Sequence, residues 1–422
     1  AMKQKLAAPP QILRSSAGGG SCCIFRVPQS LKDVNGSCYE PHVVSVGPYH
    51  HGAARLRMIE EHKWRFLAGL LKRMQQQKNS KGIGLEDLLG AVRILENPTR
   101  ECYSSAIEFS GDELAEMMVL DGCFVIEILR KFGGIVAFEA DDPLLSVSWV
   151  LPFFLRDFIR IENQVPFFIL QSLFDLTQQR SGVSLPTLAL KFFNNLLLRP
   201  ETHIEKFRGA TAKHLLDLLR SSFIPPGFDE PPEGRFSDTR IIHSISKLRR
   251  AGIRLRSRPD DDGFLAVRFR RGVISMPTIT IDDFTSCFLQ NCVVYEQSRR
   301  ASTKHVTAYV VLLDCLINTA DDVGYLCDKN IVENYFGTDG EIARLINNLG
   351  KDVSFDVDRF YLSELFNEVN GYYRNYWHVQ WASFKYTYFQ TPWSFISAAA
   401  AFVLLCLTVA QTLYTVLGYV KP

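Results

Sequence analysis

The sequence predicts a mostly α-helical globular domain that carries a small β-hairpin or short sheet and is followed by one C-terminal transmembrane helix. Three patterns support this fold class. Apolar residues recur at helical spacing behind helix-capping sequences, one stretch alternates apolar and basic residues, and the C-terminal region contains a long run without charge. We expect a disordered tail at 1–21, a helical globular domain at 22–390 and a membrane anchor at 392–418.

The N-terminal stretch contains no apolar run of signal-peptide length. It ends in three consecutive glycines at 18–20, which is typical of a disordered tail. An organellar transit peptide is the alternative, because no acidic residue precedes Asp33.

Helix signals recur through the domain. The sequence at 110–113 is a capping box, in which a serine and a glutamate satisfy each other's free amides, and the helix behind it should end at Gly133. A second capping box occupies 338–341 and precedes a helix that should end at Gly350. Leucines that follow His214 predict a further apolar helix face.

One region departs from the helical pattern. Residues 253–256 and 265–270 alternate apolar with basic side chains, as half-buried strands do, and the aspartates and glycine at 260–263 are turn-forming residues. This order predicts a β-hairpin, and 273–276 adds a third short strand. The Pro- and Gly-rich stretch 227–239 is the best internal boundary.

The same region is strongly basic. A nucleic-acid site would interleave aromatic residues on one face, and only Phe264 and Phe269 are near. A solvated hairpin face, set against anionic lipid headgroups or neutralised by the adjacent aspartates, explains the charges better. The basic residues are Lys247, Arg249, Arg250, Arg254, Arg256, Arg258, Arg268, Arg270 and Arg271.

The run from Trp393 to Val420 has no charged side chain. A bilayer core about 30 Å thick needs about 20 apolar residues, and Tyr414 and Tyr419 stand where an interfacial aromatic belt would. The alternative is a buried core helix, which rarely lies so near a chain end. Membrane contacts are expected from Trp393, Phe395, Phe402, Leu405, Leu413 and Tyr414.

Composition limits the classes of function. The chain has 422 residues, 47% of them hydrophobic, so it can bury a large core. Its net charge of +2 gives no field that steers the whole protein onto nucleic acid, and no nucleic-acid partner is expected. Ten scattered cysteines are typical of core residues in a reducing compartment. We therefore expect the large domain to be cytosolic, with no disulfide framework.

No common catalytic signature occurs, and neither a cofactor nor a metal is expected. Seven cysteines and histidines lie between Cys22 and His62, but they lack the paired spacing of a zinc site. Polar residues between apolar blocks must find partners or face a cleft, which makes 162–164 a candidate pocket or a network that caps a helix before Pro166. The candidate pocket residues are His50, His51, Glu162, Asn163 and Gln164.

Several short stretches occur in a recognisable order. They are Phe25–Pro28, Val44–Gly52, Glu61–Trp64, Cys102-Tyr103, Val119–Phe124, Glu162–Phe168, Leu248–Gly252 and Asp314–Thr319, with Pro392-Trp393 and Gln411-Thr412 near the end. In these stretches the chain resembles the plant domain-of-unknown-function 247 family along nearly its whole length after the tail. The resemblance implies a plant protein with a C-terminal transmembrane helix and no established reaction. Some grass members of that family look like pollen-side determinants of self-incompatibility.

These observations favour a membrane-anchored protein with a cytosolic recognition or signalling domain. Its expected partners are membrane lipid, through the C-terminal helix, and an unidentified protein. The alternative is an enzyme of unfamiliar type with a site near Glu162 or the His50-His51 turn.

Overall fold

The computed structural model describes residues 13, 15–76, 83–139, 142–144, 147–178, 182–225, 227–228, 241–259, 263–299, 302–351, 353, 360–374 and 392–420. Most of these residues are helical, which confirms the predicted fold class. Most of the predicted tail, most of the boundary at 227–239 and the turn residues Asp260–Asp262 lie outside this part of the chain.

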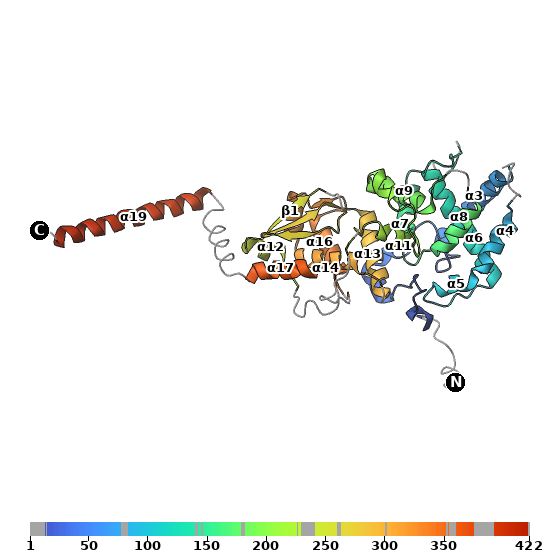
Figure 1. Cartoon of the computed structure of the whole chain (residues 1–422), viewed down its shortest axis with the longest axis horizontal. Helices are drawn as coiled ribbons and strands as arrows, with labels where there is room; N and C mark the ends of the chain where they lie inside the picture. The colour runs from blue at the N-terminus through green and yellow to red at the C-terminus, as the bar shows by residue number, and fades with distance from the viewer. Residues whose placement is uncertain are drawn as a thin grey trace, which may run out of the picture.

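In the first part of the folded body, up to Ser221, helices joined by loops make up the described residues, with one isolated β-bridge and no strand (Figure 1). Its centre is α6, which is buried over most of its length and packs against α3, α4, α8 and α9. Close approach is required there, because a Cβ on Gly122 would lie 2.5 Å from Leu173 Cδ1 of α8. The elements are η1 (Ser15–Gly18), α2 (Gln29–Asn35), η2 (Gly36–Cys38), η3 (Ala54–Leu56), α3 (Arg57–Gln75), α4 (Leu85–Ile94), α5 (Glu96–Glu101), α6 (Gly111–Phe132), α7 (Val150–Asp157), α8 (Phe167–Leu176), α9 (Leu185–Leu197), α10 (Glu201–Glu205) and α11 (Leu215–Ser221).

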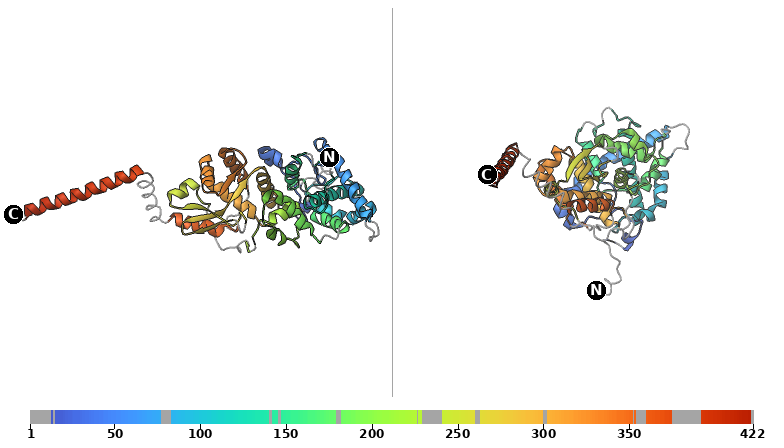
Figure 2. Two further views of the ribbon diagram at one scale, coloured as in Figure 1. Left: turned by 90° about the horizontal axis from the view of Figure 1, so that it is seen from above. Right: turned by 60° about the vertical axis from the view of Figure 1, so that its left-hand side comes forward.

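The second part combines helices with two small sheets, and α13 packs against helices of both parts (Figure 2). Its helices are α12 (Ile245–Arg250), α13 (Asp283–Ser298), α14 (His305–Leu316), α15 (Ala320–Asp328), α16 (Asp339–Leu349) and α17 (Ser363–Arg374). Its strands are β1 (Arg254–Arg258), β2 (Arg268–Arg270), β3 (Val273–Pro277), β4 (Ile279–Ile281) and β5 (Val332–Asn334).

Both predicted capping boxes are present. Ser110 accepts a hydrogen bond from the amide of Glu113, whose carboxylate accepts one from the amide of Ser110, so α6 begins where the sequence predicts. Thr338 and Glu341 make the same exchange at the start of α16. These contacts are local in sequence, which is why the pattern alone located them.

The short sheet is confirmed, but its predicted pairing was wrong. β1 and β2 do not pair with each other; β3 lies between them, parallel to β1 and antiparallel to β2. The hairpin is β2–β3, and its two turn residues, Arg271 and Gly272, have φ values of +50° and +77°. Positive φ at both turn positions matches the twist of a two-residue hairpin, so this turn fixes the pairing. β4 and β5 form a separate parallel pair.

The C-terminal helix α19 (Pro392–Val420) stands apart from the body in Figures 1 and 2. Among the described helices it alone is long and apolar enough to cross a membrane: Ile396–Leu417 has a mean hydropathy of 2.0, and none of its most apolar window is buried. At about 1.5 Å per residue its 22 residues extend about 33 Å. The predicted anchor side chains that the structure describes are exposed, namely Trp393, Phe402, Leu405, Leu413 and Tyr414.

Candidate functional site

The chain between α7 and α8 is a buried polar segment that the N-terminal residues wrap. Asp157, at the end of α7, is fully buried and accepts hydrogen bonds from the consecutive backbone amides of residues 42–44 at 2.8–3.1 Å. Arg160 Nε lies 3.0 Å from the same carboxylate. One aspartate therefore neutralises a buried arginine and satisfies three amides of a loop that has no secondary structure of its own.

Glu162 ties down an earlier piece of the same N-terminal region. Its Oε1 accepts a hydrogen bond from the amide of Val27 at 2.6 Å, and its Oε2 lies 2.9 Å from Lys32 Nζ and 3.1 Å from His50 Nε2. Burial by itself raises the pKa of Glu162, but the hydrogen bonds from His50, Lys32 and Val27 outweigh it and hold that pKa below its ordinary value. The carboxylate is therefore held charged.

Asn163 and Gln164 point to other partners. Asn163 accepts from the amide of Val46 at 2.7 Å and donates to the carbonyl of Val44 at 3.0 Å, whereas Gln164 donates to the carbonyls of Phe158 and Arg160 at 2.8 Å. The predicted candidates therefore form a network of tethers, and within it His50 and Glu162 are adjacent.

The remaining predicted candidate, His51, is exposed and packs edge-on against Phe109 with ring centroids 5.5 Å apart. Both Glu162 oxygens are engaged and the residue is only 1% exposed. We therefore interpret Glu162 as a structural tether and not as a group that reaches substrate.

A second buried ion pair supports the turn at 44–52. Lys63, fully buried on α3, donates to Asp121 Oδ1 of α6 and to the carbonyl of Ser45, both at 2.6 Å. The other Asp121 oxygen accepts the amide of Gly47 at 2.8 Å. Gly47 has φ +79°, and a Cβ there would lie 2.5 Å from the carbonyl oxygen of residue 164, so only glycine fits.

The cysteines are predominantly core groups. Cys22, Cys23 and Cys102 are buried together at the N-terminal segment, and burial raises the pKa of Cys22 to about 11. In the described ranges, no group of three or more His, Cys, Asp or Glu side chains is placed to hold a metal ion.

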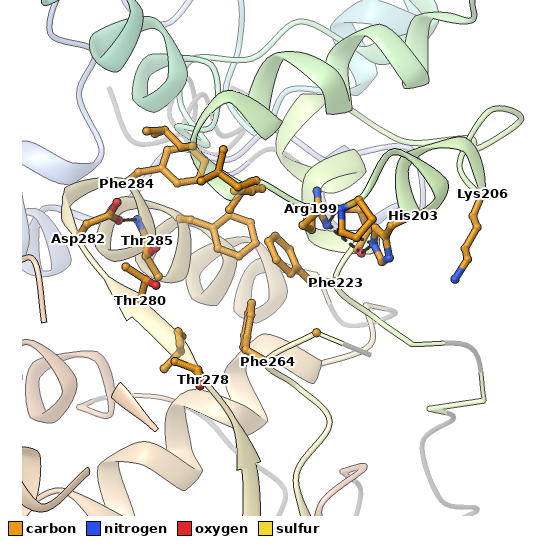
Figure 3. A pocket seen from close by; sticks show the side chains of 18 of the residues that line it. Arg199, His203, Lys206, Phe223, Phe264, Thr278, Thr280, Asp282, Phe284 and Thr285 are labelled. Carbon is orange, nitrogen blue, oxygen red and sulfur yellow. Dashed lines mark hydrogen bonds between the residues drawn. The ribbon is translucent and has the colours of Figure 1, made fainter. Parts of the chain in front are cut away.

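A cavity of about 450 Å³ lies between α9, α10 and the chain after α11 on one side and β4 and α13 on the other (Figure 3). In Figure 3 the rings of Phe223 and Phe264 lie between a cationic end, with Arg199, and an end with Asp282. A volume of this size suits a small ligand or an inserted side chain. The other lining residues include Leu196, Leu197, Leu198, His203, Lys206, Ser222, Thr278, Thr280, Phe284, Thr285 and Phe288.

The cationic end of the cavity is fixed by hydrogen bonds. Arg199 Nη1 donates to Ser222 Oγ at 3.0 Å, and its guanidinium lies 4.6 Å from the centre of the Phe223 ring. His203 Nε2 lies 3.0 Å from the carbonyl oxygen of Ser222. These contacts hold both side chains against the aromatic wall.

Leu198, at the rim of the cavity, has an unusual backbone conformation and an exposed apolar side chain. It ends α9 in the left-handed conformation, with φ +51°, and 82% of the residue is exposed. Such a conformation costs about 1–2 kcal/mol in a residue other than glycine. The sequence patterns do not predict this cavity, because its lining comes from four stretches that are distant in the chain, within 196–206, 222–223, 263–264 and 278–288. The local signal is Leu198-Arg199-Pro200, an apolar and a basic residue before a helix-starting proline.

Comparison with known proteins assigns the chain to a family. The DUF247 family, described as "Plant protein of unknown function", matches residues 24–407. The UPF0481 protein At3g47200 of Arabidopsis thaliana is 37% identical over 435 residues, which cover 98% of this chain and 90% of that protein. The putative UPF0481 protein At3g02645 of the same plant is 24% identical over 488 residues, covering 92% and 89%. No solved structure matches the chain. The chain therefore belongs to the DUF247 family of plant proteins of unknown function.

Proposed function

We propose that this protein is a membrane-anchored recognition protein, in which α19 spans a bilayer and the folded body binds a partner protein on the cytosolic side. The observation that carries the proposal is α19 itself, a 22-residue apolar span with none of its most apolar window buried against the body. An uncovered apolar surface of this size is unfavourable in water and favourable in a bilayer. Recognition of self and foreign pollen is one example of the role proposed for the body.

Support for a recognition surface comes from the cavity. Leu198 is strongly exposed although it is apolar, and its strained backbone holds it beside an aromatic wall and the fixed cation of Arg199. Apolar residues at the rim of a preformed cavity with a few placed polar groups are typical of binding sites. The Phe223 and Phe264 rings contact each other, with centroids 5.0 Å apart, and form one continuous wall. We infer that a partner inserts an apolar side chain into the cavity against this wall and packs against Leu198.

The anchoring step is tested by placing charge at the centre of the span. Leu405→Asp with Val409→Asp in the full chain should cost about 6 kcal/mol of insertion free energy and move the protein from the carbonate-resistant membrane fraction of plant cells to the soluble fraction. Ile94→Asp, at a residue of α4 that is 82% exposed, is the control and should leave fractionation unchanged. Continued membrane integration of the doubly charged variant would refute anchoring by α19.

Protease protection of the wild type reports the side on which the body lies, and protection inside a sealed lumen would refute the cytosolic assignment.

The recognition step has a matched pair of variants. Leu198 and Ile94 are each 82% exposed, and aspartate tolerates the left-handed backbone of position 198. Affinity capture of the anchored chain from cross-linked plant membranes should recover the same partner with wild type and Ile94→Asp and lose it with Leu198→Asp. Equal capture by all three chains would contradict the cavity as the binding site, and repeated capture without a specific partner would contradict the recognition role.

A further inference from the structure

The three-stranded sheet presents four arginines on one face. In its register, Arg254 of β1 and Arg270 of β2 both lie opposite Val273 of the central strand. Arg256 and Arg268 lie in the same way opposite Ser275. Residues directly opposite one another point to the same face of a sheet, so the arginines form two rows about 7 Å apart along the strands.

The other face of the sheet belongs to the core. Leu255 and Ile274 are buried, and they share a row with Phe269, whose ring lies 5.9 Å from that of Tyr372 on α17. All four arginines on the opposite face are exposed. One side of the sheet is therefore packed, and the other is an open basic surface, which we call the arginine face (Arg254, Arg256, Arg268 and Arg270).

Three of the four charges on the arginine face have no ion-pair partner among the described residues. No ion pair among the described residues involves Arg254, Arg256 or Arg270. On the packed helix α17, Glu368 lines a shallow depression together with Arg270 and Arg271. Like charges held this close repel one another, and an external anionic surface removes that repulsion.

The position of the arginine face relative to the anchor indicates the occupant. α17 packs against β2 and ends at Arg374, only 18 positions before Pro392 at the start of α19. In Figures 1 and 2, α12, β1 and α17 form the end of the body nearest α19. An anchored body therefore has its basic end close to the lipid headgroups, where clustered arginines are attracted to anionic lipid.

We propose that the arginine face binds the headgroups of anionic lipids and thereby orients the body on the membrane into which α19 inserts. This inference rests on the proposed anchoring. Each guanidinium donates hydrogen bonds to phosphate or carboxylate oxygens, and four on a flat face match a lipid surface better than they match a single small anion. RNA is the competing occupant, but its stacking sites require aromatic residues, and Phe269 faces the core side.

The test uses the full chain in lipid nanodiscs and measures how fast each arginine reacts with phenylglyoxal, by peptide mass spectrometry. In discs with about 30 mol% phosphatidylserine, the arginine face should react at least about threefold more slowly than in phosphatidylcholine discs. Arg57 on α3, whose side chain is 82% exposed, is the internal control and should react equally in both. Added salt should restore the fast reaction.

Matched variants separate the possible outcomes. Arg254→Gln with Arg270→Gln should abolish the phosphatidylserine-dependent protection of the two remaining arginines of the arginine face, whereas Glu368→Gln should preserve or increase it. Equal reaction rates in both kinds of disc, with the chain incorporated, would overturn the lipid inference and leave anchoring intact. Failure of the chain to enter discs would overturn anchoring. Protection of the arginine face by added RNA in phosphatidylcholine discs, without protection by phosphatidylserine, would identify nucleic acid and overturn the proposal.

Discussion

His214 should make the folded body sensitive to mild acid. It is fully buried, and its Nδ1 accepts a hydrogen bond from the amide of Asp217 at 3.2 Å while capping α11. Its Nε2 lies 3.1 Å from the carbonyl oxygen of Cys23 and must donate to it. The imidazole is therefore neutral with its proton on Nε2, and a second proton would break the cap and place a charge in the core.

The size of the effect follows from the pKa. Burial is the main cause that lowers the pKa of His214 from 6.5 to about 4, because the charged form loses its hydration. Between these two values the unfolded chain binds a proton that the native chain does not, so stability is complete above pH 6.5 and falls as the pH decreases. The loss is about 2 kcal/mol from pH 7 to pH 5, and about 3 kcal/mol once the pH is below 4.

The assay compares wild type with His214→Asn, a substitution that keeps a capping oxygen but does not titrate. Urea unfolding of the full chain in mild detergent, followed by tryptophan fluorescence from pH 7 to pH 5, gives the free energy of unfolding of each. The difference between the two proteins should shrink by about 2 kcal/mol over this range, because only wild type loses the contribution of His214. Parallel pH profiles would refute the assignment of His214 as a buried neutral imidazole.

Two further changes test the tethers, each by urea unfolding. Lys63→Met should lower the free energy of unfolding by about 3–5 kcal/mol, because it leaves the buried Asp121 carboxylate without its partner. Adding Asp121→Leu should recover part of this loss. A double variant that recovers nothing would contradict a direct pair. Gly47→Ala should lower the free energy of unfolding by about 2 kcal/mol more than Gly52→Ala. Both glycines have positive φ, but only a Cβ at position 47 would clash with a backbone atom, the carbonyl oxygen of residue 164. Equal costs would indicate that the turn at 47 adjusts without strain.

Local patterns in the sequence predicted local structure well. The capping boxes before α6 and α16 and the uncharged run of α19 each lie within one continuous stretch, so the pattern contains all the information that the structure uses. Strand pairing is different. β1 joins β3 across the chain, and alternation alone does not say which strand is the neighbour; the Arg271-Gly272 turn is the local signal that distinguishes the β2–β3 hairpin from the predicted one.

The candidate site was predictable only in part. Apolar residues around 162–164 indicated that these polar groups needed partners, and a buried network was one of the two alternatives that this pattern left open. Their partners, Val27, Val46 and Lys32, are more than 100 residues distant in the chain, so no spacing rule reveals them. The same reason hides the cavity at Phe223 and Phe264, which forms only when distant elements meet.

The hydrogen bonds to residues 157–164 also limit when the N-terminal segment can fold during synthesis. The backbone amide of Val27 donates to Glu162, which is synthesised 135 residues later. The amides of residues 42–44 donate to Asp157, which is also synthesised long after them. At typical translation rates the ribosome needs roughly ten seconds to make that stretch. During this interval the nascent N-terminal segment lacks its native hydrogen-bond acceptors, and its apolar residues stay exposed to water. Contacts of such high sequence separation should therefore slow the folding of the whole body.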